Sequence, residues 1–305
     1  MENPFRQIYN KMNHAAKTGQ VSSPAPLLID IEITSKCNLK CIMCEHTYMK
    51  RKQESMPWDV FSTIIEQCKS FKPGIRFIMY SEPFLHPDVL SYAKHVKDTG
   101  LLLHITTNGT LITETQIDKL IEIGLDSITF SMQGLTEKEY AYMRKNNKLP
   151  EITEKIKYIA EKRRCKPHIQ VSTTISQRDN KDDIPEFKNK WSKYADLVTV
   201  GKTSLERVAE YKSDIYDFLG VSPSLNRHYV PCQDILTKMC VFSNGDITVC
   251  CSDASGRLVV GNIRKDNLQN IWQSDVYTGL RLLLKNMRMD MLDLCKNCYP
   301  AYDFN

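Results

Sequence analysis

The residues best suited to chemistry in this sequence are its cysteines, which number 11. Three of them, Cys37, Cys41 and Cys44, are separated by three and then two residues on one short segment. Structural zinc commonly takes four ligands, often as two pairs of cysteines. Three thiolates without an obvious fourth fit a [4Fe–4S] cluster better, because such a cluster can leave one iron open to a cofactor or substrate. His46 is a weaker candidate for a fourth ligand, since loop histidines are more often simply exposed.

A second group of cysteines lies near the C-terminus. The cysteines after residue 230 are Cys232, Cys240, Cys250, Cys251, Cys295 and Cys298. Four thiolates from this group would suit either an iron–sulfur cluster or structural zinc, and spacing alone does not separate the two. Cys68 and Cys165 lie between the groups and are expected to be packing or surface residues. An odd total rules out a complete set of disulfides, so metal, cofactor or reactive-thiol roles are favoured.

The composition is that of an ordinary globular protein. The chain has 305 residues, 42% of them hydrophobic and 25% charged, with a formal net charge of +5. So small an excess of positive charge gives no reason to expect nucleic acid or a membrane surface as a partner. No apolar run of about 18 residues appears, and the first residues lack the apolar core of a signal peptide. We therefore expect a cytoplasmic protein.

The elements that must position the cysteines alternate regularly. Strand-like segments are predicted at 27–34, 75–80, 101–107, 125–131, 168–175 and 196–200. Helical segments are predicted between them, at 57–71, 86–100, 113–124, 137–145, 151–163 and 182–194. Such alternation predicts a parallel sheet with right-handed crossovers, either an open doubly wound sheet or an incomplete barrel. In both, chemistry belongs at the carboxyl ends of the strands, where the polar residues Ser81, Glu82, Asn108, Ser131 and Gln133 are expected.

The pattern changes after about residue 205. Asn244-Gly245 stands between two short β-prone runs in the segment 241–249, which predicts a hairpin. An amphipathic segment at 267–288 then leads to Cys295 and Cys298. A small hairpin with flanking cysteines builds little core of its own, so a cluster or metal is expected to stabilise it.

In this context the Cys37–Cys44 motif resembles that of the radical S-adenosylmethionine superfamily. The resemblance implies a partial (β/α)6 TIM-like barrel in which Cys37, Cys41 and Cys44 hold a [4Fe–4S] cluster. Its open iron would chelate S-adenosylmethionine, which is cleaved to a 5′-deoxyadenosyl radical. Met43 occupies a position that is usually aromatic, Ser81 replaces a glycine, and Gln133 stands where aspartate is usual. The cofactor-binding residues implied are Met43, Ser81, Glu82, Asn108, Ser131 and Gln133, with Glu82 on the methionine ammonium. Tyr140 and Arg144 match a further family pattern, although a surface salt bridge would explain Arg144 almost as well.

The C-terminal cysteines resemble the SPASM/twitch extension found on part of this superfamily. Their spacing is similar to that of 2-deoxy-scyllo-inosamine dehydrogenase-like members, which implies one auxiliary [4Fe–4S] cluster held by Cys232, Cys250, Cys295 and Cys298. Cys251 is the rival of Cys250, and Cys240 is expected to pack. The implied organisation is a leader segment (1–26), a radical S-adenosylmethionine barrel (27–205) and a linker with a small hairpin-and-helix iron–sulfur domain (206–305).

The resemblance predicts an oxidoreductase that acts on a small polyhydroxy substrate such as a sugar, an aminocyclitol or a nucleotide-linked sugar. An alcohol would be oxidised to a ketone, with the auxiliary cluster accepting an electron. Arg178 and Lys202 near the expected mouth would suit an anionic substrate. A donor such as flavodoxin or ferredoxin would supply reducing electrons. No general base is identifiable.

Three other functions are compatible with the sequence. Related enzymes modify peptides or proteins, but 26 residues before the first strand are too few for a winged-helix adaptor, which favours a small molecule. An epimerase would need a hydrogen-atom donor, for which Cys165, Cys240 and Cys251 are candidates. A non-catalytic iron–sulfur carrier or zinc-binding protein would have no need of an open iron, which argues against that class.

Overall fold

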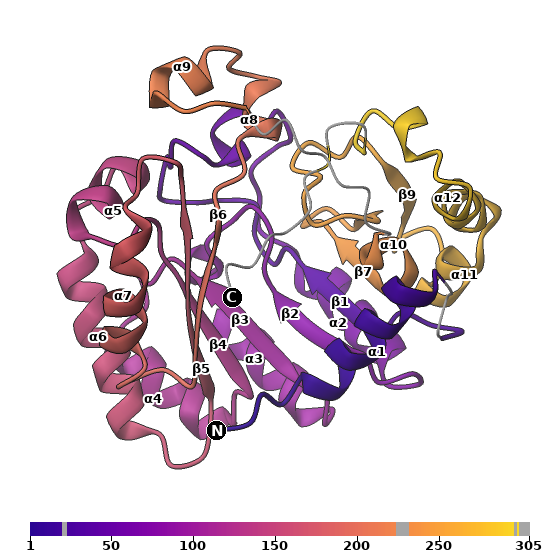
Figure 1. Cartoon of the computed structure of the whole chain (residues 1–305). Coiled ribbons are helices and arrows are strands. Elements are labelled where there is room, and N and C mark those ends of the chain that lie inside the picture. The colour runs from indigo at the N-terminus through magenta and orange to yellow at the C-terminus, as the bar shows by residue number, and fades with distance from the viewer. Residues whose placement is uncertain (20–22, 224–231, 296–297, 299–305) are drawn as a thin grey trace.

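A nine-stranded sheet organises the protein (Figure 1). The computed structural model describes residues 1–19, 23–223, 232–295 and 298. In these residues the strand order is β6-β5-β4-β3-β2-β1-β7-β8-β9. The strands are β1 (Leu28–Ile31), β2 (Gly74–Phe77), β3 (Leu103–Thr107), β4 (Ser127–Ser131), β5 (His168–Ile175), β6 (Leu197–Lys202), β7 (Lys238–Val241), β8 (Asp246–Thr248) and β9 (Val259–Asn262).

The first six strands are parallel, and neighbours in the sequence are neighbours in the sheet. β6 and β9 are the two edges, so the barrel is partial, as predicted. Helices cover the outer face: α2 (Trp58–Cys68), α3 (Val89–Asp98), α4 (Glu114–Ile123), α5 (Glu137–Arg144), α6 (Leu149–Lys162) and α7 (Ile184–Trp191). The observed strands and helices differ from the predicted segments by a few residues at their ends. A capping box of Thr113 and Gln116 begins α4, and Gly124 ends it in the left-handed conformation.

The C-terminal region continues the same sheet. β7 pairs in parallel with β1 and turns back into β8, so the predicted hairpin is present but its first strand lies inside the sheet. α10 (Gln233–Thr237) precedes β7, and the predicted amphipathic segment is two helices, α11 (Leu268–Gln273) and α12 (Asp275–Lys285), divided at Ser274. Two short helices, α8 (Glu206–Ala209) and α9 (Ile215–Leu219), occupy the segment after β6. The domain boundaries near residues 26 and 205 stay a prediction.

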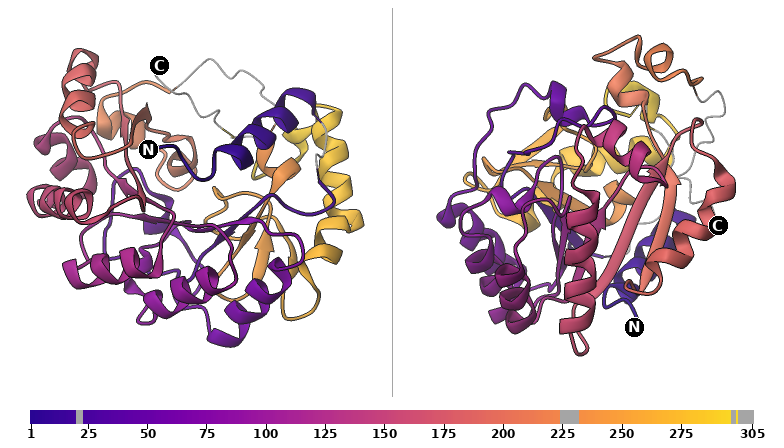
Figure 2. Two further views of the ribbon diagram at one scale, coloured as in Figure 1. Left: turned by 90° about the horizontal axis from the view of Figure 1, so that it is seen from below. Right: turned by 90° about the vertical axis from the view of Figure 1, so that its left-hand side faces the viewer.

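A helix that the sequence reading did not predict covers the amino-terminal end of the barrel. α1 (Arg6–Thr18) packs against α10 and lies alongside the C-terminal helices (Figure 2). Just before it, the buried Phe5 ring contacts His104 edge-on, with ring centres 6.0 Å apart. A Cβ on Gly74 would lie only 2.7 Å from this ring, so β2 begins with the residue that allows the contact.

The barrel interior beside β1 is charged. Asp30 is fully buried and accepts hydrogen bonds from Arg76 of β2 at 2.6 and 2.8 Å. The ammonium of Lys238 on β7 lies 3.2 Å from Asp30 and 2.7 Å from Asp234 of α10. Buried charges persist only when paired, so this group ties β1 to both of its neighbours. No helix of the described residues is long and apolar enough to cross a membrane.

Candidate functional site

A cavity of about 520 Å³ opens where the parallel strands end at their carboxyl termini. The segment between β1 and α2 supplies one wall with Cys37, Cys41, Met43 and Cys44. The ends of β2 to β6 supply the others, including the predicted residues Ser81, Asn108, Ser131 and Gln133. The structure therefore brings the three cysteines together with five of the six predicted cofactor-binding residues.

The three thiols of this loop form one electrostatic group. Burial is the main reason that the pKa of Cys37 is raised to about 11 and that of Cys44 to about 12. The charges of both thiols also interact with the charge of Cys41. Iron binding removes such protons, because a metal-coordinating thiol is deprotonated. Three soft thiolates at the rim of a cavity fit a [4Fe–4S] cluster that leaves one iron without a protein ligand.

Hydrogen bonds from outside the loop fix its shape. Asn38 donates to the Thr110 hydroxyl at 2.8 Å, and Asn108 donates to the side-chain oxygen of Asn38 at 3.0 Å. These contacts join the cysteine loop to the turn that follows β3. His46 lines the cavity, but its Nε2 lies 3.0 Å from the carbonyl oxygen of Ser35. That nitrogen is therefore already used in a backbone contact.

Glu82 lies beneath the cavity and does not line it. Its side chain is fully buried and accepts hydrogen bonds from the Thr107 hydroxyl and the Asn108 backbone, both at 2.7 Å, and from the Phe84 backbone at 3.2 Å. Burial raises its pKa to about 7, although these donors oppose the rise. The carboxylate thus supports the turn that carries Asn108, and its contact with the methionine ammonium stays a prediction.

Arg144 is a buried residue of the site. Its guanidinium donates to the Ser131 hydroxyl at 2.7 Å and to the Met132 carbonyl at 2.9 Å, and lies 3.8 Å from the Cys41 sulfur. The alternative of a surface salt bridge is therefore wrong for Arg144. A permanent cation beside a thiolate of the cysteine loop stabilises negative charge there.

The far wall of the cavity is rich in hydroxyl groups. The Gln133 amide donates to the Thr203 hydroxyl at 2.6 Å and accepts from the Thr174 hydroxyl at 2.7 Å, which links the ends of β4, β5 and β6. Other lining residues on these strands and just after β6 are Ser172, Thr173, Thr199, Lys202 and Ser204. Arg178, the second cation proposed from the sequence, is absent from the described lining and stacks 5.2 Å from the Tyr142 ring.

Tyr80, Glu45 and Arg207 are among the cavity residues that the sequence did not predict. Tyr80 donates a hydrogen bond of 2.6 Å to Glu45, and burial raises the pKa of Glu45. Arg207 of α8 also lines the cavity, and its charge acts on both Cys295 and Cys298. Tyr80 precedes the predicted residue Ser81, and Glu45 follows the predicted ligand Cys44. This nearness in the sequence was the one feature that could have identified them. Arg207 carried none, because its region resembled no regular element.

The C-terminal cysteines form a second electrostatic group. The Cys232 charge interacts with that of Cys298, Cys250 with Cys232, and Cys295 with Cys298. Burial raises the pKa of each of these four thiols. Four thiols connected by these pairwise interactions match in number and type the donor set of an auxiliary [4Fe–4S] cluster.

Cys251 lies against the buried ion group, with which the charge of Cys250 also interacts. The Cys251 sulfur lies 3.7 Å from the Asp234 carboxylate, and its charge is opposed by Lys238 of the buried ion group. Cys240 lies in that interior too, 3.8 Å from Asp30. This arrangement supports Cys250 over Cys251 as the auxiliary ligand, and the assignment stays a prediction.

Comparison with known proteins gives matches to two domain models and to two relatives of similar length. The radical SAM superfamily model matches residues 31–189, and that of the SPASM iron-sulfur cluster-binding domain matches residues 232–299. A tungsten-containing aldehyde ferredoxin oxidoreductase cofactor-modifying protein of Pyrococcus furiosus is 26% identical over 88% of this chain and 86% of its own. The S-adenosyl-L-methionine-dependent 2-deoxy-scyllo-inosamine dehydrogenase of Niallia circulans is 22% identical over 89% and 92%.

A solved structure shares the fold. Streptococcus suis SuiB bound to precursor peptide SuiA superimposes with a TM-score of 0.65 at 19% identity, covering 92% of this chain and 72% of SuiB. The two domain matches imply [4Fe–4S] clusters and S-adenosylmethionine as cofactors.

Proposed function

Because this chain belongs to the radical SAM superfamily, we propose that it is an oxidoreductase that oxidises an alcohol group of a small polyhydroxy substrate to a ketone. When bound, the catalytic cluster and S-adenosylmethionine supply the removal of one hydrogen atom, and an auxiliary cluster supplies an acceptor for the second electron. Cys37, Cys41 and Cys44 would hold the first cluster. Cys232, Cys250, Cys295 and Cys298 would hold the second.

The observation that carries the proposal is the chemistry of the cavity wall. Ser172, Thr199 and Ser204, which carry hydroxyl groups, line the cavity. Hydroxyl groups both donate and accept hydrogen bonds, so they complement a substrate that carries several hydroxyl groups. A cavity of about 520 Å³ is in the range of small-molecule sites, which run from about 300 to 1,000 Å³.

Two cations in the same cavity extend the proposal to an anionic substrate. Lys202 ends β6 and Arg207 follows on α8, and both line the cavity. A phosphate or carboxylate on the substrate would find charge-assisted donors there. We therefore place nucleotide-linked sugars and sugar acids beside neutral aminocyclitols among the candidates.

Two relatives that match most of this chain favour a small molecule, whereas PqqA peptide cyclases, which act on a peptide, match 41% of it or less. Of the first two, one dehydrogenates 2-deoxy-scyllo-inosamine and the other is named for modifying a cofactor. The peptide-bound neighbour shows the fold alone at its 19% identity. An epimerase would need a thiol near the substrate, but Cys165, Cys240 and Cys251 are not among the described residues that line the cavity.

The test is anaerobic turnover of the iron-loaded enzyme with S-adenosylmethionine and a reduced flavodoxin or ferredoxin. Sugars, aminocyclitols and nucleotide-linked sugars would be deuterated at each carbinol carbon, and the panel would include the cofactor of a tungsten-containing aldehyde ferredoxin oxidoreductase. We expect deuterium in 5′-deoxyadenosine together with one ketone per turnover. Deuterium transfer only from a peptide, or ketone formation without transfer, would refute the proposal.

The hydroxyl wall has its own test. Thr199→Val removes a lining hydroxyl at nearly constant volume, and Thr153→Val on the outer helix α6 is the matched control. We expect the first change to raise KM for the accepted substrate about tenfold, the effect of about one lost hydrogen bond, and the control to leave KM unchanged.

A further inference from the structure

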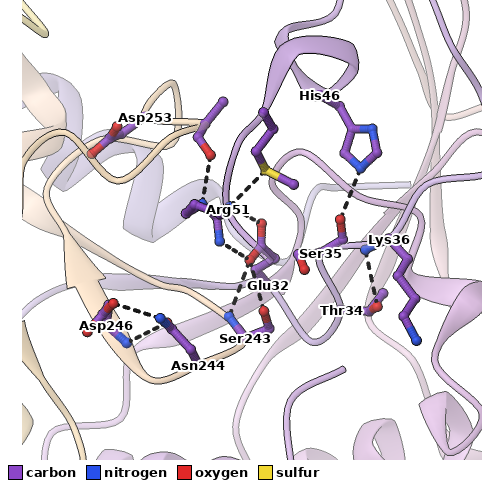
Figure 3. A network of polar contacts seen from close by, with 12 residues as sticks. Glu32, Thr34, Ser35, Lys36, His46, Arg51, Ser243, Asn244, Asp246 and Asp253 are labelled. Atoms are coloured by element: carbon purple, nitrogen blue, oxygen red, sulfur yellow. Dashed lines mark hydrogen bonds and ion pairs between the residues drawn. The ribbon is translucent and has the colours of Figure 1, made fainter. Parts of the chain in front are cut away.

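One arginine joins the cysteine loop to three other segments (Figure 3). Arg51 stands after the short helical turn Glu45–Tyr48 that follows Cys44. Its guanidinium donates to both carboxylate oxygens of Glu32, at 2.7 and 3.0 Å. Glu32 follows β1 and is fully buried, while the Arg51 side chain is 14% exposed. A bidentate pair with one partner removed from water is geometrically specific.

Apart from a contact of 3.3 Å between its guanidinium and the Met49 sulfur, the other contacts of Arg51 go to the C-terminal region. Its Nε donates to the carbonyl oxygen of Ala254 at 2.7 Å. Its guanidinium carbon lies 3.8 Å from the centre of the Phe242 ring. Ala254 lies in the loop that follows Cys250, and Phe242 follows β7, so both belong to the part of the chain that carries the auxiliary cysteines.

Glu32 strengthens the same connection. One of its carboxylate oxygens accepts hydrogen bonds from the backbone and the hydroxyl of Ser243, at 3.2 and 3.3 Å. The Glu32 carboxylate is therefore shared between Arg51, which follows the cysteine loop, and Ser243 in the β7–β8 turn. Only arginine presents a planar fork, a further Nε donor and a face that stacks on an aromatic ring.

We propose that Arg51 and Glu32 are a positioning pair that sets the separation between the catalytic and auxiliary clusters. Arg51 holds the loop after Cys250 against the segment after Cys44, and Glu32 holds Arg51. The pair touches neither the cavity nor a cysteine among the described residues, so it acts through the two loops. The inference rests on the two clusters and is independent of the identity of the substrate.

The experiment measures the distance between the two reduced clusters by pulsed electron paramagnetic resonance on the iron-loaded enzyme. Arg51→Lys keeps the charge beside Glu32 but removes the fork. Arg51→Met with Glu32→Gln removes the pair without leaving a buried charge. The matched control is Arg264→Lys, whose exposed ion pair with Asp59, at 3.0 Å, also joins the C-terminal region to α2.

We expect Arg51→Lys and the double variant to broaden the distribution of distances between the two clusters while their iron content stays at the wild-type level. The distribution should be broader in the double variant than in Arg51→Lys. The control should match the wild type. Hydrogen exchange in the segment 242–254 should quicken about tenfold in Arg51→Lys and remain unchanged in Arg264→Lys.

A wild-type distance distribution in an iron-loaded double variant would overturn the proposal. If the double variant loses iron, the exchange of segment 242–254 in Arg51→Lys decides, and a wild-type rate there would overturn it as well. Because neither measurement uses substrate, a failed alcohol-oxidation assay leaves this test intact.

Discussion

Asp30 pairs with cations on both strands that flank β1, Arg76 of β2 and Lys238 of β7. Replacing Asp30 by asparagine therefore tests how the barrel strands and the C-terminal strands are joined. The carboxylate is fully buried and binds Arg76 through two hydrogen bonds of 2.6 and 2.8 Å. It also lies 3.2 Å from the ammonium of Lys238. Asparagine keeps the size of the side chain but removes its charge.

The expected cost falls mainly on Arg76. Lys238 retains the Asp234 carboxylate at 2.7 Å, whereas the ion pair of Arg76 in the described residues is with Asp30. Breaking a buried pair by removing one partner costs about 3–5 kcal/mol, because the other charge is left uncompensated. Domains of ordinary stability have about 5–15 kcal/mol in total, so Asp30→Asn should remove a large share.

The assay is guanidinium unfolding of the iron-loaded enzyme under anaerobic conditions, followed by circular dichroism. We expect a clear fall in the midpoint for Asp30→Asn. Asp30→Leu combined with Arg76→Met removes both charges and should recover most of the loss, since apolar residues of similar volume replace buried pairs at little cost. A loss below about 1 kcal/mol for Asp30→Asn, or a double variant no more stable than the single one, would refute the reasoning.

The remaining predictions concern acid stability, cluster ligation and a strained turn. Burial alone would raise the pKa of Asp30, but Arg76 and then Lys238 hold it at about 2, below its ordinary value of 3.8. The stability this supplies is complete above pH 4 and lost as the pH falls towards 2, so the wild type and Asp30→Asn should converge in acid unfolding titrations. Cys250→Ala should lower the iron content from about eight to about four per chain while Cys251→Ala keeps about eight, and equal losses would contradict the ligand assignment. Gly134→Ala should cost about 1–3 kcal/mol in urea unfolding, because φ is +72° and the new Cβ would lie 2.4 Å from that of Glu139. Gly124→Ala, with φ +79° and open space around it, should cost only about 1 kcal/mol.

The parts of the site that lie on local motifs were predictable from the sequence. Cys37, Cys41 and Cys44 share one loop, and Asn108 and Ser131 end or follow strands whose β-branched residues identify them. Residues at the carboxyl ends of parallel strands lie on one rim of the barrel, so their grouping can be predicted without knowing any distance between them. The partial barrel and the cavity at its rim follow from these two facts.

The missing parts depend on pairing across long distances in the chain. β7 lies beside β1 although about 200 residues separate them, and no local pattern records that register. The same holds for Arg207, which reaches the cavity from a segment without periodicity. Cys250 was favoured over Cys251 through the resemblance alone, because no local pattern decides between two adjacent cysteines whose side chains leave the chain in different directions.

The position of β1 places the two groups of cysteines on one continuous sheet. This strand lies between β2 of the barrel and β7 of the C-terminal region, so it is bonded to both. Its inward carboxylate, Asp30, pairs with cations from each side, and Glu32 just beyond the strand repeats the arrangement with Arg51 and Ser243. Two acids, two residues apart, therefore face the same interior, as the period of a strand requires. Under the proposed function, an electron leaving the substrate would pass to the auxiliary cluster. The ion pairs on both sides of this central strand would then hold the distance between the clusters without any contact to the substrate.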